Sequence, residues 1–216
     1  MTDMDNRCRL VLVLPELDDS DRQVERLEAA LSGGDVASVI LTQGALDDAT
    51  FQKQAERLVP IVQQAGAAAI IAGDSRVAGR VKADGLHVAQ GAEMIAEAVE
   101  KFTPKLIVGA GGASDRHQAL EIGEARPDYM FFGKLDGDIK PEAHPKNLAL
   151  GEWWASMIEI PCIVLAGTDP ASALAVAETG AEFVALRQAV FAAEAPGAVV
   201  AAVNALLDEK APRFED

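Results

Sequence analysis

The chain has 216 residues, of which 34 are acidic and 19 basic, so its formal net charge at pH 7 is −15. A chain of this length can bury one large core, and we expect a single domain over residues 1–216. The excess of negative charge disfavours nucleic acid and anionic membrane surfaces as partners. A phosphorylated small molecule stays compatible with it, because a few cations and backbone amides can bind a phosphate locally.

Nothing in the sequence indicates secretion or a membrane span. The first residues, MTDMDNR, lack the basic and apolar regions of a signal peptide, and no apolar run approaches the roughly 18 residues of a membrane span. Cys8 and Cys162 each lie in an apolar run, which is typical of buried free thiols. We therefore expect a cytoplasmic protein, with a frayed tail over residues 210–216.

Short apolar runs alternate with segments of helical periodicity along the whole chain. The runs span residues 9–14, 38–42, 68–72, 86–89, 106–109, 129–133, 162–166 and 183–186. Most are almost uniformly apolar, as strands covered on both faces are, and each connection is long enough for a crossover helix. The pattern predicts an α/β fold, a single (β/α)8 TIM barrel, with the first helix capped by the acidic and hydroxyl residues at 18–20.

The longest irregular stretch is KLDGDIKPEAHPK at residues 134–146, a length that favours an active-site loop. Asp136 and Asp138, flanked by Lys134 and Lys140, could hold a magnesium ion and a diphosphate, because hard oxygen ligands and ammonium groups suit those species. A solvated polar lid explains the same charges.

In a barrel, function belongs to the residues that follow the carboxyl ends of the strands. Glu16, after the first predicted strand, meets this condition. Gly167 and Thr168 after the seventh strand, with Arg187 and Gln188 after the eighth, are the best candidates for phosphate binding. The alternative is an ordinary turn followed by a solvated arginine.

The glycine-rich segment GAGGASDRH at residues 109–117 follows the fifth predicted strand and lets the backbone approach a ligand. Ser114 or Asp115 can instead simply cap the next helix, with His117 in its exposed first turn. In the fourth strand, successive side chains point to opposite faces, so His87 lies on the other face from Leu86 and Val88. His87 therefore points into the barrel or packs under a helix.

Four motifs, in their order along the chain, resemble those of thiamine phosphate synthases and the related thiazole tautomerases. They are ADGLHVAQ at 83–90, PDYMFFG at 127–133, IPCIVLAG at 160–167 and GAEFVALRQA at 180–189. The resemblance implies a (β/α)8 barrel, commonly a homodimer. It also implies a transferase that joins hydroxymethylpyrimidine diphosphate to thiazole phosphate with the help of Mg2+.

The same resemblance suggests roles for single residues. His87 would line the pyrimidine pocket, Lys140 lies near the place of a diphosphate-binding lysine, and Ser114 stands where tautomerases carry a catalytic histidine, with His117 three residues later. The remaining candidates are Gln43, Arg76, Gln90 and Lys134 for substrate binding, with Asp74 and Glu93 for the metal.

The chain departs from the family pattern at the atoms that perform the synthase reaction. The segment ILTQG at 40–44 lacks the two cations that grip the diphosphate, and Asp74 and Glu93 each come one position late for the metal. Three functions therefore remain: a synthase-type transferase, a tautomerase-like enzyme, or a non-catalytic binder of a phosphorylated heterocycle. The adjacent Trp153 and Trp154 mark a subunit contact or packing against the barrel.

Overall fold

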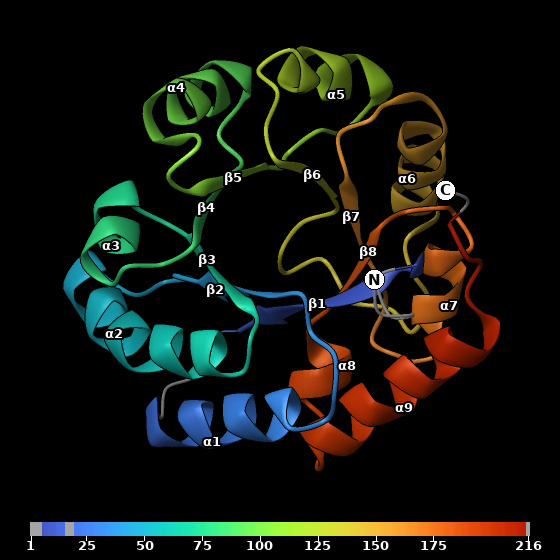
Figure 1. Cartoon of the computed structure of the whole chain (residues 1–216), viewed down its shortest axis with the longest axis horizontal. Helices are drawn as coiled ribbons and strands as arrows, with labels where there is room; N and C mark the ends of the chain where they lie inside the picture. The colour runs from blue at the N-terminus through green and yellow to red at the C-terminus, as the bar shows by residue number, and fades with distance from the viewer. Residues whose placement is uncertain (1–5, 16–19, 215–216) are drawn as a thin grey trace.

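The computed structural model describes residues 6–15 and 20–214. Eight parallel strands follow one another around a closed barrel, and β1 pairs with β8 to close it (Figure 1). The strands are β1 (Arg9–Leu14), β2 (Ser38–Thr42), β3 (Ala68–Ala72), β4 (Gly85–Val88), β5 (Ile107–Ala110), β6 (Tyr129–Phe132), β7 (Cys162–Leu165) and β8 (Phe183–Leu186). The predicted (β/α)8 barrel is confirmed, with strand ends displaced from the prediction by at most one residue.

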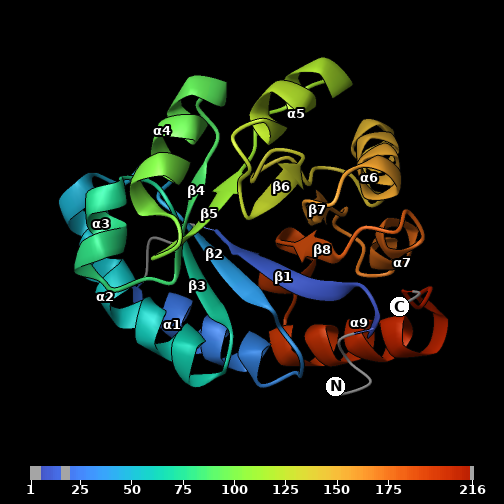
Figure 2. The same ribbon diagram turned by 45° about the horizontal axis from the view of Figure 1, so that its top comes forward.

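Helices surround the strands as an outer ring (Figure 2). They are α1 (Ser20–Leu31), α2 (Asp48–Gln64), α3 (Ser75–Arg80), α4 (Ala92–Phe102), α5 (Arg116–Gly123), α6 (Pro145–Met157), α7 (Ser172–Ala177), α8 (Gln188–Phe191) and α9 (Pro196–Lys210). The short α8 is an extra turn between β8 and the final helix. The predicted cap at Asp18 and Asp19, and the loop candidate Glu16, lie outside the described residues.

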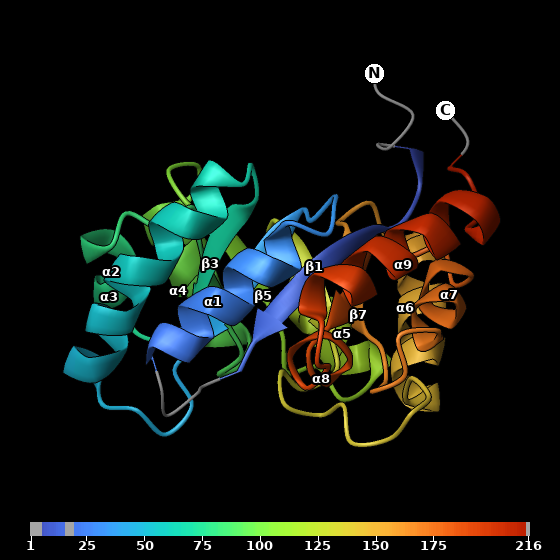
Figure 3. The same cartoon turned by 90° about the horizontal axis from the view of Figure 1, so that it is seen from below.

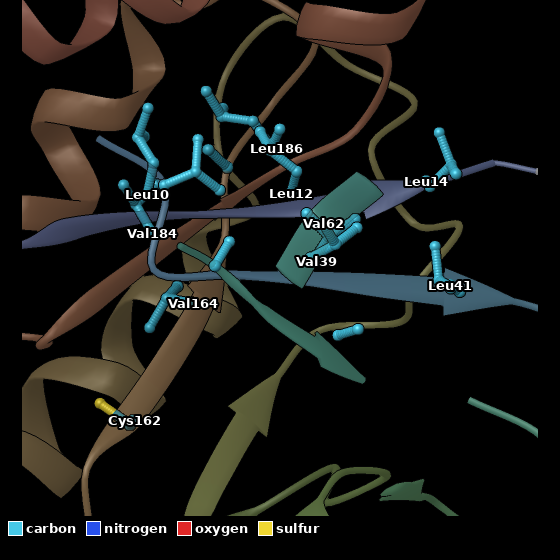
Figure 4. Close-up of a cluster of buried hydrophobic side chains, with 14 of the residues drawn as sticks. Leu10, Leu12, Leu14, Val39, Leu41, Val62, Cys162, Val164, Val184 and Leu186 are labelled. Atoms are coloured by element: carbon cyan, nitrogen blue, oxygen red, sulfur yellow. The ribbon is translucent and has the colours of Figure 1, made fainter. Parts of the chain in front are cut away.

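Alternate residues of each strand enter two separate cores. Leu10, Leu12 and Leu14 of β1 pack outward in the cluster that includes Val62 of α2 (Figure 4). The residues between them point into the barrel, where the interior cluster consists of Val11, Val13, Ile40, Ile70, Tyr129, Phe131, Ile163, Leu165 and Ala185. Apolar residues on both faces explain why the strands read as continuous apolar runs rather than alternating ones.

Helix α6 begins within the stretch predicted to be a loop. Pro145 occupies the start of the helix, and the Nδ1 atom of His144 accepts a hydrogen bond from the Lys146 N–H at 3.1 Å. The prediction that the loop reaches Lys146 is therefore wrong, because Pro at the first helical position has no N–H to leave unpaired and its φ already suits a helix.

The two tryptophans of α6 have different surroundings. Trp154 is fully buried, and its Nε1–H donates to the Ile160 carbonyl at 2.7 Å. Trp153 is half-buried, with the Arg116 guanidinium over its ring at 5.1 Å. Packing against the barrel, one of the two predicted explanations, accounts for Trp154.

The two ends of the described chain meet at the start of β1. Arg7 and Arg213 form an antiparallel bridge, and the Phe214 N–H donates to the Asn6 carbonyl at 3.1 Å. Cys8 and Cys162 are free and buried, as predicted, and burial raises the pKa of both thiols. No described helix is long and apolar enough to cross a membrane.

Candidate active site

The polar residues that follow the strands gather at one end of the barrel, where the β6–α6 loop and α8 lie (Figure 3). Two of the cavities among the loops at this end are lined by predicted site residues. One, of about 270 Å³, lies between the residues after β5 and the beginning of α6. The other, of about 340 Å³, lies between α3 and α4 beside the ends of β3 and β4.

His87 lies inside the barrel, one of the two predicted alternatives. The sheet register places His87, Gly109 and Tyr129 side by side on β4, β5 and β6. His87 Nδ1 is 3.0 Å from the Tyr129 hydroxyl, and the His87 ring meets Phe131 edge-on with centroids 5.5 Å apart. Glycine at 109 makes room for this pair, because a Cβ there would lie 1.8 Å from the Tyr129 ring.

Burial keeps both polar groups of this pair neutral. Desolvation lowers the pKa of His87 from 6.5 to about 4 and raises the pKa of Tyr129, since neither charged form is solvated inside the barrel. The other ring nitrogen, Nε2, faces the loop after β5, where a Cβ on Gly111 would approach it to 2.9 Å. A neutral imidazole there can donate or accept one hydrogen bond, according to its tautomer.

The cavity beside β5 and β6 carries positive charge in a chain whose net charge is −15. Lys134 and Lys146 both line it, and its lining residues, all in the described part of the chain, include no carboxylate. Ser114 is also in the lining, where its hydroxyl lies 2.8 Å from Gln118 Oε1. Asp115 caps α5 by accepting from the Gln118 N–H, so the predicted cap is confirmed. Two ammonium groups make this cavity suitable for an anion.

His117 and Lys140 are exposed and do not line this cavity. The side chain of His117 is 84% exposed on the first turn of α5, and its Nε2 lies 3.5 Å from Glu121 Oε1. It does not line the cavity that Ser114 lines. Lys140 is exposed, and its backbone carbonyl accepts from the Thr168 N–H at 2.8 Å.

The candidate site residues after β2 and β3 form hydrogen bonds with nearby residues of the chain. Both carboxylate oxygens of Asp74, which caps α3, accept hydrogen bonds from Arg76, and this pairing lowers the pKa of Asp74. Gln43 donates to Asp48 Oδ1 at 2.8 Å and to the Leu46 carbonyl at 3.0 Å. Arg76 and Gln43 therefore each already donate to a carboxylate of this chain.

The residues present do not fit the magnesium ion that the resemblance implies. Asp74 and Gln90 line the cavity between α3 and α4, but Glu93 is not among its lining residues, whereas Glu97 is. Arg76 already occupies the carboxylate of Asp74. Within residues 6–15 and 20–214, no three His, Cys, Asp or Glu side chains are arranged to hold a metal ion.

The predicted phosphate ligands after β7 and β8 lie together, and each already has a partner within the chain. The Gly167 N–H donates to the Ser172 hydroxyl at 2.9 Å, and the Thr168 N–H is held by the Lys140 carbonyl. Asp138 accepts from the Gln188 N–H at 2.6 Å and from Arg187 Nη1 at 3.2 Å.

The sequence does not reveal the roles of two residues, Tyr129 and Asp138. In the sequence, Tyr129 is recognisable only as a strand residue. Its contact with His87 depends on a register across β4, β5 and β6 that one sequence does not specify. Asp138 stands out as a loop carboxylate with a possible metal role, whereas its partner Arg187 is 49 residues away in the chain. The available signal is an acidic and a basic residue that both follow strands at the same end of the barrel, after β6 and β8.

Comparison with known proteins agrees with the fold and identifies a family. Residues 10–190 match the family described as thiamine monophosphate synthase. A thiamine-phosphate synthase from Hyphomonas neptunium is 31% identical over 212 residues, which cover 95% of this chain and 96% of the relative. One from Rhodospirillum centenum is 34% identical over 205 residues, which cover 93% and 98%.

Solved structures show the same architecture. The thiamine phosphate pyrophosphorylase of Pyrococcus furiosus superposes with a TM-score of 0.78 at 23% identity, over 96% of this chain and 98% of that one. A geranylgeranylglyceryl phosphate synthase from Thermoplasma acidophilum, in complex with sn-glycerol-1-phosphate, gives a TM-score of 0.68 at 14% identity, over 97% and 99% of the two chains.

Fold and site together define a (β/α)8 barrel whose polar groups lie at the carboxyl ends of the strands. Within that class, the chain belongs to the thiamine monophosphate synthase family.

Proposed function

We propose that the chain is a transferase of the thiamine phosphate synthase type, joining a pyrimidine diphosphate to a thiazole phosphate. The observation that carries the proposal is similarity to thiamine-phosphate synthases at 31% and 34% identity over nearly the whole length of both chains. In this reaction the thiazole nitrogen forms a bond to the pyrimidine methylene carbon. The bond from that carbon to the diphosphate oxygen breaks, and the diphosphate leaves with the electron pair.

The described residues provide contacts that could bind the flat heterocycle, but fewer groups that could stabilise its leaving diphosphate. His87 offers one neutral hydrogen-bonding edge toward Gly111, and Tyr129 and Phe131 supply an apolar interior beside it. Lys134 and Lys146 supply positive charge in the neighbouring cavity, where an anionic group of the ligand would bind.

A second candidate function is binding of a phosphorylated heterocycle without the synthase reaction. It is favoured because residues predicted to bind the diphosphate and the metal are already paired with other side chains. Asp74 is paired with Arg76, and Gln43 is tied to Asp48. Each charge-assisted hydrogen bond missing from a diphosphate clamp removes roughly 1.5–3 kcal/mol of stabilisation. Loss of two such cations would weaken catalysis while leaving the fold and the pocket intact.

Incubation of the purified protein with both substrates and magnesium chloride separates the two functions. The synthase proposal expects thiamine phosphate to accumulate, at a rate that falls roughly tenfold in His87→Ala, which removes a hydrogen-bonding group of the pocket, and stays unchanged in His117→Ala. Absence of product together with calorimetric binding of thiazole phosphate would overturn the synthase proposal and leave the binder.

We also propose that the protein is a cytoplasmic homodimer. Met94 on α4 and Leu120 on α5 are 49% and 45% exposed, and these helices lie side by side (Figure 1). Large apolar side chains exposed on neighbouring helices can form part of a subunit contact. Light scattering of the eluted protein tests the dimer, and Leu120→Glu should shift the mass toward the monomer if this face forms it.

A further inference from the structure

Asp138 is a loop residue whose charged group is fully withdrawn from solvent. Its carboxylate is 0% exposed, although it lies in the β6–α6 loop between residues that are exposed. The next residue, Ile139, is 83% exposed. A loop that buries its aspartate and exposes its isoleucine reverses the hydrophobic preference, so specific partners must hold the carboxylate in place.

Those partners are the groups expected to bind a phosphate. One oxygen of Asp138 accepts from the backbone N–H of Gln188 at 2.6 Å, and the other accepts from Nη1 of Arg187 at 3.2 Å. Arg187 is itself mostly buried, with 18% of its side chain exposed. An anion held by a backbone amide and a guanidinium is the arrangement that binds phosphate in proteins.

The rest of the loop occupies the neighbouring donors. The Lys140 carbonyl accepts from the Thr168 N–H at 2.8 Å, and the Pro141 carbonyl accepts from the Asp169 N–H at 3.1 Å. Gly167 permits this approach, because a Cβ there would lie 2.0 Å from the Pro141 carbonyl oxygen. The loop therefore covers the ends of both β7 and β8, with the Asp138 carboxylate at its innermost point.

We propose that Asp138 is an internal anion that determines specificity at the β7–β8 site: it occupies the donors of Arg187 and Gln188, so a phosphate monoester binds there only by displacing it. The inference rests on the proposed phosphate role of these strands. It means that the wild-type site discriminates against simple phosphate, and that a ligand must gain binding elsewhere in the pocket to open the loop.

The test is calorimetric titration of inorganic phosphate into the full-length protein and three variants at neutral pH and low salt. Asp138→Ala should bind phosphate at least roughly tenfold more tightly than the wild type, since two charge-assisted donors become available. Asp136→Ala is the matched control, because it removes the same charge from an exposed position in the same loop. It should bind as the wild type does.

The double variant Asp138→Ala with Arg187→Gln assigns the gain to this site. Loss of the gain in the double variant supports the proposal, whereas equal phosphate affinity in wild type and Asp138→Ala overturns it. If Asp138→Ala does not fold by circular dichroism, Asp138→Asn replaces it. A gain of about threefold is then expected, because the amide oxygen still accepts from Gln188 while the charge opposite Arg187 is gone.

The synthase assay is independent of this result. If the wild type makes product and Asp138→Ala gains no phosphate affinity, the inference fails and the proposed function stands. If Asp138→Ala gains affinity and no variant makes product, the inference stands and the synthase proposal fails.

Discussion

His87 couples the interior of the barrel to pH. Its folded pKa is about 4, below the ordinary value of 6.5, because the ring is desolvated. The unfolded chain therefore takes up a proton at higher pH than the folded chain does. The stability that depends on neutral His87 is fully present above about pH 6.5 and is lost as the pH falls toward 4.

We predict that His87→Gln removes this part of the pH dependence. Between about pH 7 and pH 5, the wild type should lose roughly 2 kcal/mol more free energy of unfolding than His87→Gln does. Urea denaturation at the two pH values measures the difference. His117→Gln, which changes an exposed histidine, should follow the wild type; parallel losses in wild type and His87→Gln would contradict a buried neutral ring.

At the scale of elements, the sequence predicts the strands well because both faces of each strand are buried. Alternate residues of β1 pack into two different cores, so residues 10–14 are all apolar and the ends of the strand can be recognised in the sequence. The beginning of α6 is less visible, since Pro145 and His144 suit a loop as well as a helix start.

The sequence predicts where the site lies in the barrel, but not which of its residues contact one another. The rule that function lies at the carboxyl ends of strands selects Thr168, Arg187 and the β6–α6 loop from sequence alone. That Asp138 fills the donors of Arg187 depends on the path of a loop whose conformation is set by distant strands. The His87–Tyr129 contact likewise depends on the register of three strands.

Helix α6 is anchored on the barrel by one of its two tryptophans. Trp154 is fully buried, meets Phe132 of β6 edge-on and donates to the Ile160 carbonyl. We predict that Trp154→Ala lowers the free energy of unfolding by about 3–5 kcal/mol, through the cavity and the unpaired carbonyl that it leaves.

Trp153→Ala is the matched control on the same helix. Its side chain is half-buried and loses a cation–π contact with Arg116, so a cost of about 1 kcal/mol is expected. Equilibrium urea unfolding compares the two variants. Equal losses would show that the tryptophans bury similar areas, against the burial seen here.

At the scale of the whole molecule, a closed barrel has to join its first strand to its last elements, and Arg7 makes that connection. Its side chain is 1% exposed and donates to Asp208 Oδ1 at 2.6 Å, to the Cys8 carbonyl at 2.8 Å and to Asn204 Oδ1 at 3.1 Å. Asp208 and Asn204 belong to α9, so one guanidinium ties the beginning of β1 to the final helix.

Removal of this guanidinium should therefore weaken the closure of the barrel rather than one local segment. We predict that Arg7→Ala lowers the free energy of unfolding by about 2–4 kcal/mol, because the buried Cys8 carbonyl and Asn204 Oδ1 lose their donor and a cavity remains. The denaturant slope should stay unchanged, since the same surface is exposed in one cooperative transition. Arg80→Ala, which loses one exposed hydrogen bond to Gln52, should change stability by less than about 0.5 kcal/mol. Similar unfolding midpoints for the two variants would mean that the barrel closes through β1–β8 pairing alone.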